Sequence, residues 1–280
     1  MSTAYVEPRS VDEAVGLLAE DEESRPLAGG QSLMVLLRQG LSQPSRLVSL
    51  HGIPDLARVT ATDEVLVGSM VTYREAAESP DLRPLAALED ACRLVGPIPV
   101  QNAGTPGGSI CHNAPGADVP PALLALDAAA VVRSPAGERR IALTDFFEGY
   151  FETALRPRDL LTAIAIPRPA QGTVSAYLKF NVRLVDMALV GVAVALRLEG
   201  GVTRDVRVAL GGVAAVPFRA VAAERVLEGR APEPGLVQEA GRVAASEREL
   251  VSDLHGSASY RRRVIPVLVR RAFEQALARV

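Results

Sequence analysis

Apolar positions in the first hundred residues follow two alternating patterns. Short apolar runs typical of strands occupy residues 4–7, 25–28 and 46–50, and a hairpin is predicted to join 56–61 to 64–68. Amphipathic segments, with apolar residues every three or four positions, predict helices between and after these strands. The predicted helices span residues 10–20, 33–39, 73–78 and 85–95. Strands and helices that alternate over such short connections are typical of a compact α+β domain.

Two of these helices begin with the spacing of a capping box. Ser10 precedes Glu13 by three positions, and Thr72 precedes Glu75 in the same way. In this arrangement a hydroxyl and a carboxylate each accept a hydrogen bond from the backbone of the first turn. We therefore expect both helices to start at these residues.

The pattern breaks over residues 96–121, where Gly, Pro, Asn and Ser crowd the stretch GPIPVQNAGTPGGSICHNAPGADVPP. We predict a long irregular loop there, and such a loop inside a compact domain usually has a function. A helix is predicted to resume over 120–126. Strands over 128–133 and 139–143 are then predicted to pair across the turn at Pro135, Ala136 and Gly137.

A domain boundary is predicted at 167–172, in the sequence PRPAQG. Beyond it, strands are expected first, at 173–181, 188–198 and 203–210, and helices afterwards, at 217–227, 234–248 and 257–278. A run of strands followed by a run of helices predicts a second α+β domain with an antiparallel sheet.

Composition narrows the class of protein. The 280 residues are 48% hydrophobic and carry a net charge of -3, which argues against a disordered chain and against a basic nucleic-acid footprint. No apolar run reaches about 18 residues, so no membrane span is expected. No export signal is visible near the N-terminus, and we expect a cytoplasmic protein. Two cysteines, Cys92 and Cys111, are too few for a disulfide framework or a CxxC metal site.

Two glycine-rich loops are candidate binding sites. The first, Ala28-Gly29-Gly30-Gln31-Ser32-Leu33, lies between a predicted strand and a helix start, where free backbone N–H groups favour an anion such as a pyrophosphate. The second runs from Thr105 to Asp118. Neither is a Walker loop or a GxGxxG fingerprint. Taken alone, a Gly-Gly pair before a helix also fits a simple tight turn.

Together these motifs resemble the FAD-binding medium subunit of molybdenum hydroxylases, the carbon monoxide dehydrogenase and xanthine dehydrogenase family. The similarity extends from AGGQSL and TPGGSICHNAPGAD to LLTAIAIP, which begins at Leu160, and KFNVRLVDMALVGVAVAL, which begins at Lys179. The resemblance implies a two-part FAD-binding domain of the PCMH/VAO type over residues 1–170, split near 55–60. It also implies a CO dehydrogenase flavoprotein-like C-terminal domain over 171–280, with a three-stranded antiparallel sheet and a helical bundle.

The same resemblance implies which residues would contact FAD. The first loop would wrap the diphosphate, the second would contact the diphosphate, ribityl and ribose groups, Leu161 would pack near the flavin ring and Lys179 would lie near its edge. The implied cofactor-binding residues are Ala28, Gly29, Gly30, Gln31, Ser32, Leu33, Thr105, Gly108, Ser109, His112, Asp118, Leu161 and Lys179. No catalytic residue and no metal site is expected in this chain.

Two of these residues allow other interpretations. Asp118 also stands where it could cap the helix predicted at 120–126. Lys179 is the one lysine among 30 lysine and arginine residues. Strand alternation places it on the same face as Tyr177, opposite Leu178 and Phe180. We expect that face to line the cleft between the domains, and the alternative is a solvent-exposed lysine.

The resemblance implies an electron-transfer role for this subunit. A molybdopterin-binding large subunit would oxidise the substrate, and a small subunit with [2Fe-2S] clusters would deliver electrons to FAD. An external acceptor, NAD, a quinone or oxygen, would receive them. The two cysteines of this chain agree with a cluster in a partner subunit, because an iron–sulfur cluster usually needs four cysteines. Two alternatives remain open: a self-contained FAD oxidoreductase acting on a small substrate, and a structural subunit without FAD.

Overall fold

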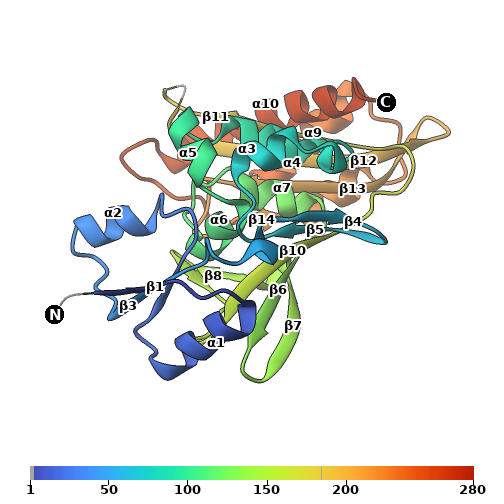
Figure 1. Ribbon diagram of the computed structural model, residues 1–280. Helices are drawn as coiled ribbons and strands as arrows, with labels where there is room; N and C mark the ends of the chain where they lie inside the picture. The colour runs from blue at the N-terminus through green and yellow to red at the C-terminus, as the bar shows by residue number, and fades with distance from the viewer. Residues whose placement is uncertain (1–2, 184) are drawn as a thin grey trace.

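The computed structural model describes residues 3–183 and 185–280. Residues 1, 2 and 184 lie outside the described part, and the last of these falls within the motif that begins at Lys179. The described strands form sheets of three, five and four strands and a small two-stranded hairpin (Figure 1). Within the described residues, no helix combines the length and apolar character needed to cross a bilayer.

The first sheet is parallel and has the order β1-β3-β2. Its strands are β1 (Ala4–Val6), β2 (Arg25–Leu27) and β3 (Arg46–Ser49). They are connected by the helices α1 (Val11–Glu20) and α2 (Leu33–Arg38). Three buried side chains of α1 share a core with the strand ends, Ala14, Val15 and Leu18. All five predicted elements of this region are thus confirmed, to within one or two residues at their ends.

Both predicted N-caps are present. Thr72 forms a complete capping box with Glu75 at the start of α3 (Tyr73–Glu78). At α1, the Ser10 hydroxyl accepts from the Glu13 N–H at 3.1 Å. The Glu13 carboxylate, however, accepts from the N–H of Arg9, one residue before the expected partner.

The second sheet is antiparallel, with the order β4-β5-β10-β6-β7. Both hairpins predicted in this region are confirmed as strand pairs. The strands are β4 (Val59–Ala61), β5 (Glu64–Gly68), β6 (Ala129–Ser134), β7 (Gly137–Ala142) and β10 (Leu160–Pro167). Three short 3-10 turns accompany them, Pro54–Ala57, Pro80–Leu82 and Leu143–Asp145.

The prediction of an irregular loop over residues 96–121 is wrong. After the predicted helix α4 (Ala86–Leu94), this segment forms two short helices and starts a third, α5 (Ile98–Ala103), α6 (Pro106–His112) and α7 (Val119–Ala125). Prolines in these helices occupy first-turn positions, where a missing N–H costs nothing. A proline-rich composition was therefore compatible with several short helices.

The third sheet is antiparallel and contains the three long strands that the sequence predicted, β11 (Thr173–Phe180), β12 (Val190–Glu199) and β13 (Val202–Gly211). A two-residue strand, β14 (Phe218–Arg219), extends the order to β11-β12-β13-β14. This short strand occupies the beginning of the helix predicted at 217–227, which as α8 spans Val221–Leu227. The other two helices are α9 (Pro234–Ala244) and α10 (Ala258–Leu277).

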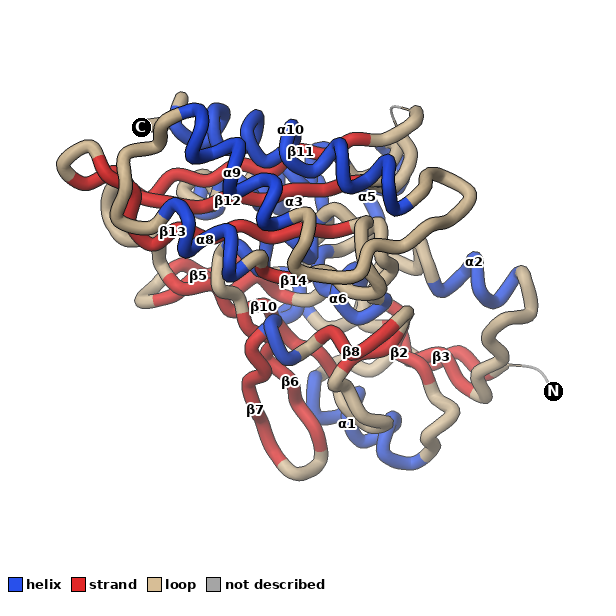
Figure 2. Tube along the Cα trace, turned by 180° about the vertical axis from the view of Figure 1, so that it is seen from behind, coloured by secondary structure: helices blue, strands red, loops and turns tan. Residues whose placement is uncertain are grey.

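Helices cover both faces of the third sheet (Figures 1 and 2). On one face, α8 and α10 contact its strands, and their apolar side chains form a core with Leu178 and Phe180. On the other face, α4 and α7 contact the same strands, and Tyr177 belongs to the core of the second sheet. The third sheet is therefore the layer that joins the two halves of the chain.

Candidate functional site

A cavity of about 660 Å³ lies where both glycine-rich loops meet. This volume is within the range of small-molecule and cofactor sites. Most of the residues predicted to bind the cofactor line it: Ala28, Gly29, Gly30, Gln31, Ser32, Leu33, Thr105, Gly108, Ser109, His112 and Leu161. The structure thus brings together loops that are more than seventy residues apart in the sequence.

The first loop presents unused backbone donors to this cavity. It connects β2 to α2, and Gly30 has a positive φ of 69° that favours glycine. Among the described residues, none accepts a hydrogen bond from the N–H of Gly29, Gly30, Gln31 or Ser32. Neighbouring free N–H groups attract an anion, so this wall fits a diphosphate.

Close contact between the two loops requires a glycine at position 29. A Cβ there would lie 1.8 Å from the carbonyl oxygen of Ala103 and 2.8 Å from the Cα of Gly104. The second loop follows directly after these residues, so the absence of a side chain at Gly29 sets the spacing of the two loops.

The second loop is held by its own caps and by a neighbouring tyrosine. The Thr105 hydroxyl accepts from the N–H of Gly108 at 2.9 Å and so caps α6. The N–H of Tyr73 donates to the carbonyl of Gly104 at 2.9 Å. Tyr73 and Ser69 both line the cavity, although the sequence analysis did not identify them. The capping box before Tyr73 indicated that a helix starts there, but no sequence signal indicated that this helix lies beside the second loop.

A third wall of the cavity was also missed. It comes from the hairpin β8 (Phe147–Gly149) and β9 (Glu152–Thr153) and from the segment that leads to β10. The lining residues here are Glu148, Phe151, Glu152, Thr153, Leu155, Arg156, Pro157, Arg158, Asp159 and Leu160. The sequence of this segment has no helical or strand periodicity. The one nearby signal was the motif LLTAIAIP, which follows the segment.

Asp159 fixes the end of this wall. Its carboxylate accepts two hydrogen bonds from Arg139, at 2.9 and 2.6 Å, and one from the N–H of Arg156 at 2.6 Å. Burial acts to raise the pKa of Asp159, but these donors hold its pKa below the ordinary value of a carboxyl group. The segment before β10 is therefore tied to β7 by a charged pair.

Asp118 and Lys179 do not line the cavity, so their predicted contact with FAD finds no support in its lining. They form a buried ion pair instead, with 3.1 Å between the Lys179 Nζ and the Asp118 Oδ2. The Tyr177 hydroxyl donates to the same carboxylate at 2.7 Å. The Asp118 side chain makes no capping bond to α7, so the capping alternative is wrong.

Lys179 has two further partners, one in each half of the chain. Its ammonium donates to the carbonyl of Leu94 at 2.6 Å and to that of Asp186 at 3.0 Å. The predicted face is therefore correct, because Lys179 points toward α4, and the solvent-exposed alternative is wrong: its side chain is 3% exposed. Burial raises the pKa of Asp118, and the Lys179 charge acts in the opposite direction.

The titratable side chains at the cavity suit binding better than catalysis. Burial raises the pKa of the Cys111 thiol to about 12, so it stays protonated at neutral pH and is a poor nucleophile. Burial lowers the pKa of His112, whose neutral ring lies 5.0 Å from the ring of Phe151. In the described part of the chain, no group of three His, Cys, Asp or Glu side chains could hold a metal ion.

Comparison with known proteins agrees with this geometry. Residues 1–169 match the FAD binding domain in molybdopterin dehydrogenase, and residues 175–276 match the CO dehydrogenase flavoprotein C-terminal domain. The chain is 36% identical to the carbon monoxide dehydrogenase medium chain of Afipia carboxidovorans, covering 98% of this chain and 96% of the relative. It is 34% identical to the glyceraldehyde dehydrogenase medium chain of Sulfolobus acidocaldarius, with 97% of each covered.

Solved structures give the same result for the fold. Carbon monoxide dehydrogenase from Hydrogenophaga pseudoflava contains a chain that superimposes with a TM-score of 0.96 at 35% identity, covering 100% of this chain and 98% of that one. A chain of quinoline 2-oxidoreductase from Pseudomonas putida gives 0.93 at 32% identity, covering 99% and 97%. The protein therefore belongs to the family of FAD-binding medium subunits of molybdenum hydroxylases, of the carbon monoxide dehydrogenase and xanthine dehydrogenase type, and is an oxidoreductase subunit.

Proposed function

We propose that this chain is the electron-transfer subunit of a molybdenum hydroxylase complex and that it holds FAD in the cavity between its two glycine-rich loops. When bound, FAD would supply the redox chemistry that passes electrons from the [2Fe-2S] clusters of a small partner subunit to NAD, a quinone or oxygen. A molybdopterin-binding large subunit is the origin of these electrons, because substrate oxidation belongs to that partner.

The observation that carries this proposal is the meeting of two glycine-rich loops at one cavity with unused backbone donors. The N–H groups of Gly29 to Ser32 would bind the diphosphate, since each can donate to a charged oxygen without losing another partner. Ser109 and His112 add polar groups beside them, and Leu161 adds an apolar surface for a ring. Asp118 and Lys179 form an ion pair with each other, so the proposed site does not include them.

We further propose that the chain divides into an FAD-binding domain over 1–170 and a C-terminal domain over 171–280, with the first domain in two parts that meet near 55–60. The position of the sheets supports these boundaries. The first sheet ends at Ser49 and the second starts at Val59, while β10 ends at Pro167 and β11 starts at Thr173.

Flavin content of the purified chain tests the proposal first. We expect a yellow protein that contains stoichiometric FAD, which acid releases because the proposed contacts are not covalent. A colourless protein that takes up no added FAD would leave the structural-subunit alternative in place.

Activity with and without partners tests the electron-transfer role. Produced together with large and small subunits of its complex, the chain is expected to assemble with them, and the complex to oxidise substrate. The chain alone is expected to bind FAD but to oxidise no organic substrate. Specific turnover of such a substrate by the isolated chain would instead support a self-contained oxidoreductase.

A further inference from the structure

Asn113, the residue directly after His112, ends helix α6 in an unusual backbone conformation. Its φ is 45° and its ψ 47°, in the left-handed region, and its N–H donates to the carbonyl of Ser109. The side chain is fully buried. Asparagine tolerates this conformation better than most residues, so the position suits it as a helix C-cap.

The side-chain amide of Asn113 is directed to the β8–β9 hairpin. Its Nδ2 donates to the carbonyl oxygens of Gly149 and Glu152, both at 2.8 Å. These two residues are paired across the hairpin and enclose its turn, Tyr150 and Phe151. The main-chain carbonyl of Asn113 also accepts from the N–H of Phe151, at 3.4 Å.

The Asn113 side chain bonds to the hairpin through its NH₂ group and not through its amide oxygen. Among the described residues, Asn113 Oδ1 is buried without a hydrogen-bond partner. Leaving a buried acceptor unpaired costs about 1–3 kcal/mol. The two donated bonds offset that cost, and a side chain without an NH₂ group could not make them.

The turn that Asn113 holds is itself strained. Phe151 has a φ of 58°, a conformation that costs a bulky residue on the order of 1–3 kcal/mol. Its ring is 5.0 Å from that of His112, and both residues line the cavity, whereas Asn113 does not. The strained turn thus presents an aromatic side chain to the cavity wall, and Asn113 bonds to three of the residues that form it.

We propose that Asn113 is a positioning residue of the cofactor cavity, which holds Phe151 against His112 at one wall of the cavity. The proposal rests on the placement of FAD in this cavity. Without the two amide bonds, the turn is free to relax from its strained conformation and to withdraw the ring. Bound FAD then loses its contact with this wall and dissociates faster.

Two substitutions remove the donors in different ways. Asn113→Gly keeps the left-handed conformation without strain but lacks the amide, and Asn113→Asp keeps the size but turns a donor into an acceptor that faces two carbonyls. Both are expected to raise the FAD dissociation rate at least tenfold, as measured by the recovery of flavin fluorescence on dilution. The visible circular dichroism of the bound flavin is expected to change as well.

A matched control separates this role from general stability. The buried Thr203 hydroxyl also lies within hydrogen-bond distance of two main-chain carbonyls, those of Leu227 and Arg230, but it is in the third sheet away from the cavity. Thr203→Val is expected to lower the unfolding temperature and to leave the dissociation rate of FAD unchanged. If the Asn113 variants behave in the same way as Thr203→Val, the positioning role is refuted.

A second variant tests whether Asn113 acts through Phe151. Phe151→Gly removes the ring and adopts the positive φ without strain, so it should raise the dissociation rate by itself. Adding Asn113→Gly to Phe151→Gly should then have little further effect, and additive effects would contradict the proposal. Gly108→Val tests the placement of the FAD site itself. If Gly108→Val leaves FAD binding unchanged, FAD binds elsewhere. If it weakens FAD binding while the Asn113 variants have no effect, only the role of Asn113 is refuted.

Discussion

Among single residues, Lys179 makes contacts that its strand pattern did not indicate. Its ammonium is enclosed by the Asp118 carboxylate and two main-chain carbonyls, which together satisfy its three donors. A buried charge is tolerated when it is paired in this way, and removing one partner leaves the other uncompensated. The pair joins β11 to the start of α7, so its primary role here is to hold the two halves of the chain together.

Replacing the lysine tests this role. Lys179→Met is expected to lower the free energy of unfolding by about 3–5 kcal/mol at pH 7, because the Asp118 carboxylate stays buried without its counter-charge. The midpoint potential of bound flavin should change little, since Lys179 lies outside the cavity lining. A shift of about 30 mV to more negative potential, worth roughly 1.4 kcal/mol for two electrons, would instead restore its expected position at the flavin edge.

The same variant has a pH dependence of known sign. The pKa of Asp118 is already raised by burial, and loss of Lys179 raises it further. The folded state then binds a proton more tightly than the unfolded state, so stability rises as pH falls through the raised pKa toward the ordinary carboxyl value of the unfolded chain. We expect the deficit of Lys179→Met to shrink on acidification and the double variant Lys179→Met/Asp118→Asn to be more stable than the single one at pH 7. Urea unfolding at several pH values measures both.

Gly29 allows a residue-scale prediction about binding. Gly29→Ala would place a methyl group against the carbonyl of Ala103, so the two loops must separate. Loss of two hydrogen bonds to a charged diphosphate costs roughly 3–6 kcal/mol, at about 1.5–3 each. We expect FAD affinity, measured by fluorescence titration of the apoprotein, to fall more than a hundredfold.

Gly16 provides the control for this substitution. It is exposed in α1, and a Cβ there would meet nothing within 4 Å. Gly16→Ala should leave FAD affinity unchanged and, as an alanine in a helix, stabilise the chain by up to about 1 kcal/mol. Affinities of the two variants within threefold of each other would contradict the assignment of Gly29 to the site.

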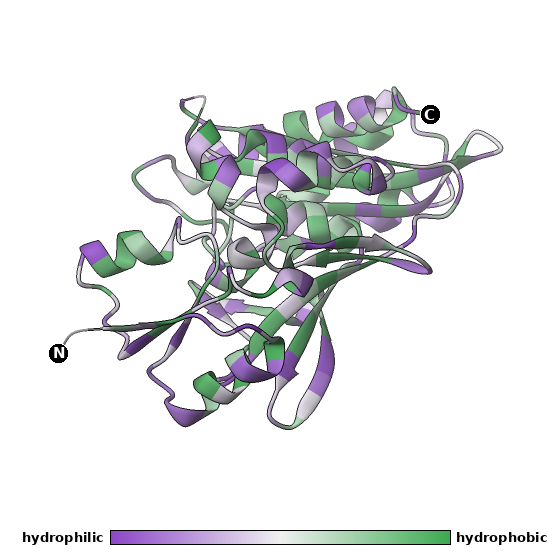
Figure 3. Ribbon diagram, in the orientation of Figure 1, coloured by the Kyte–Doolittle hydropathy of each residue, from purple (hydrophilic) through white to green (hydrophobic). Residues whose placement is uncertain are grey.

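At the scale of elements, α2 would gain packing contacts from a cofactor bound in the cavity. This short helix projects from the rest of the molecule and is largely hydrophobic (Figures 1 and 3). None of its residues is buried, and Met34 and Val35 are exposed. Leu33 and Leu36 line the cavity. A cofactor in the cavity would therefore supply contacts that the chain itself does not provide.

Limited proteolysis measures this dependence. Trypsin should cleave the apoprotein after Arg38, which is exposed at the end of α2, by local unfolding of the helix. FAD at a hundred times its dissociation constant stabilises the bound state by about 2.7 kcal/mol, so cleavage there should slow about a hundredfold. Cleavage after Arg230, which is exposed in the loop before α9, should not change. Equal protection of both sites by FAD would show global rather than local stabilisation.

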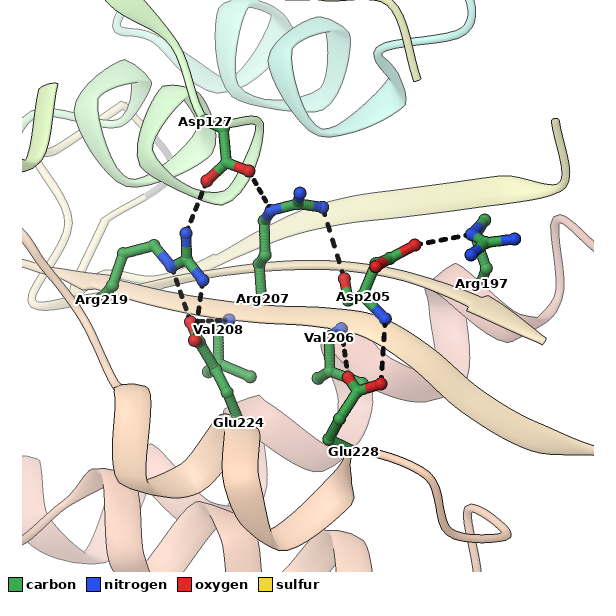
Figure 4. Close-up of polar contacts among 9 residues, drawn as sticks. All are labelled: Asp127, Arg197, Asp205, Val206, Arg207, Val208, Arg219, Glu224 and Glu228. Atoms are coloured by element: carbon green, nitrogen blue, oxygen red, sulfur yellow. Dashed lines mark hydrogen bonds and ion pairs between the residues drawn. The ribbon is translucent and has the colours of Figure 1, made fainter. Parts of the chain in front are cut away.

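For the whole molecule, a second polar network connects the two halves of the chain. Asp127, between α7 and β6, pairs with Arg207 of β13 and Arg219 of β14 (Figure 4). Arg219 also makes two 2.7 Å bonds to Glu224 of α8. Glu224 is buried and accepts from the N–H of Val208 at 3.0 Å. The network thus ties a connection of the first half to both the sheet and a helix of the second.

Substitution of Glu224 tests how much this network contributes. Glu224→Gln removes the charge that Arg219 binds and turns one acceptor into a donor facing the guanidinium. We expect a loss of about 3 kcal/mol in the free energy of unfolding. Glu274→Gln breaks the exposed pair with Arg270 on α10 and should cost less than about 0.5 kcal/mol. Equal losses in urea unfolding would mean that burial of Glu224 adds nothing.

The sequence by itself determined the features that depend on neighbours a few residues apart. The caps at Ser10 and Thr72, the two hairpins of the second sheet and the alternation that places Lys179 opposite Phe180 all follow from local hydrogen bonds and side-chain period. The two glycine-rich loops were recognisable for the same reason, because each is a continuous motif.

Only the tertiary structure decided which distant residues meet. The partner of Lys179 is 61 positions away, and the Asn113 amide reaches residues 36 and 39 positions further along the chain. No local pattern specifies such contacts, because they depend on how whole sheets and helices pack. Packing also made helices of residues 106–125 in the proline-rich segment, whose composition alone favoured a loop, since burial against the second and third sheets outweighs weak local propensity.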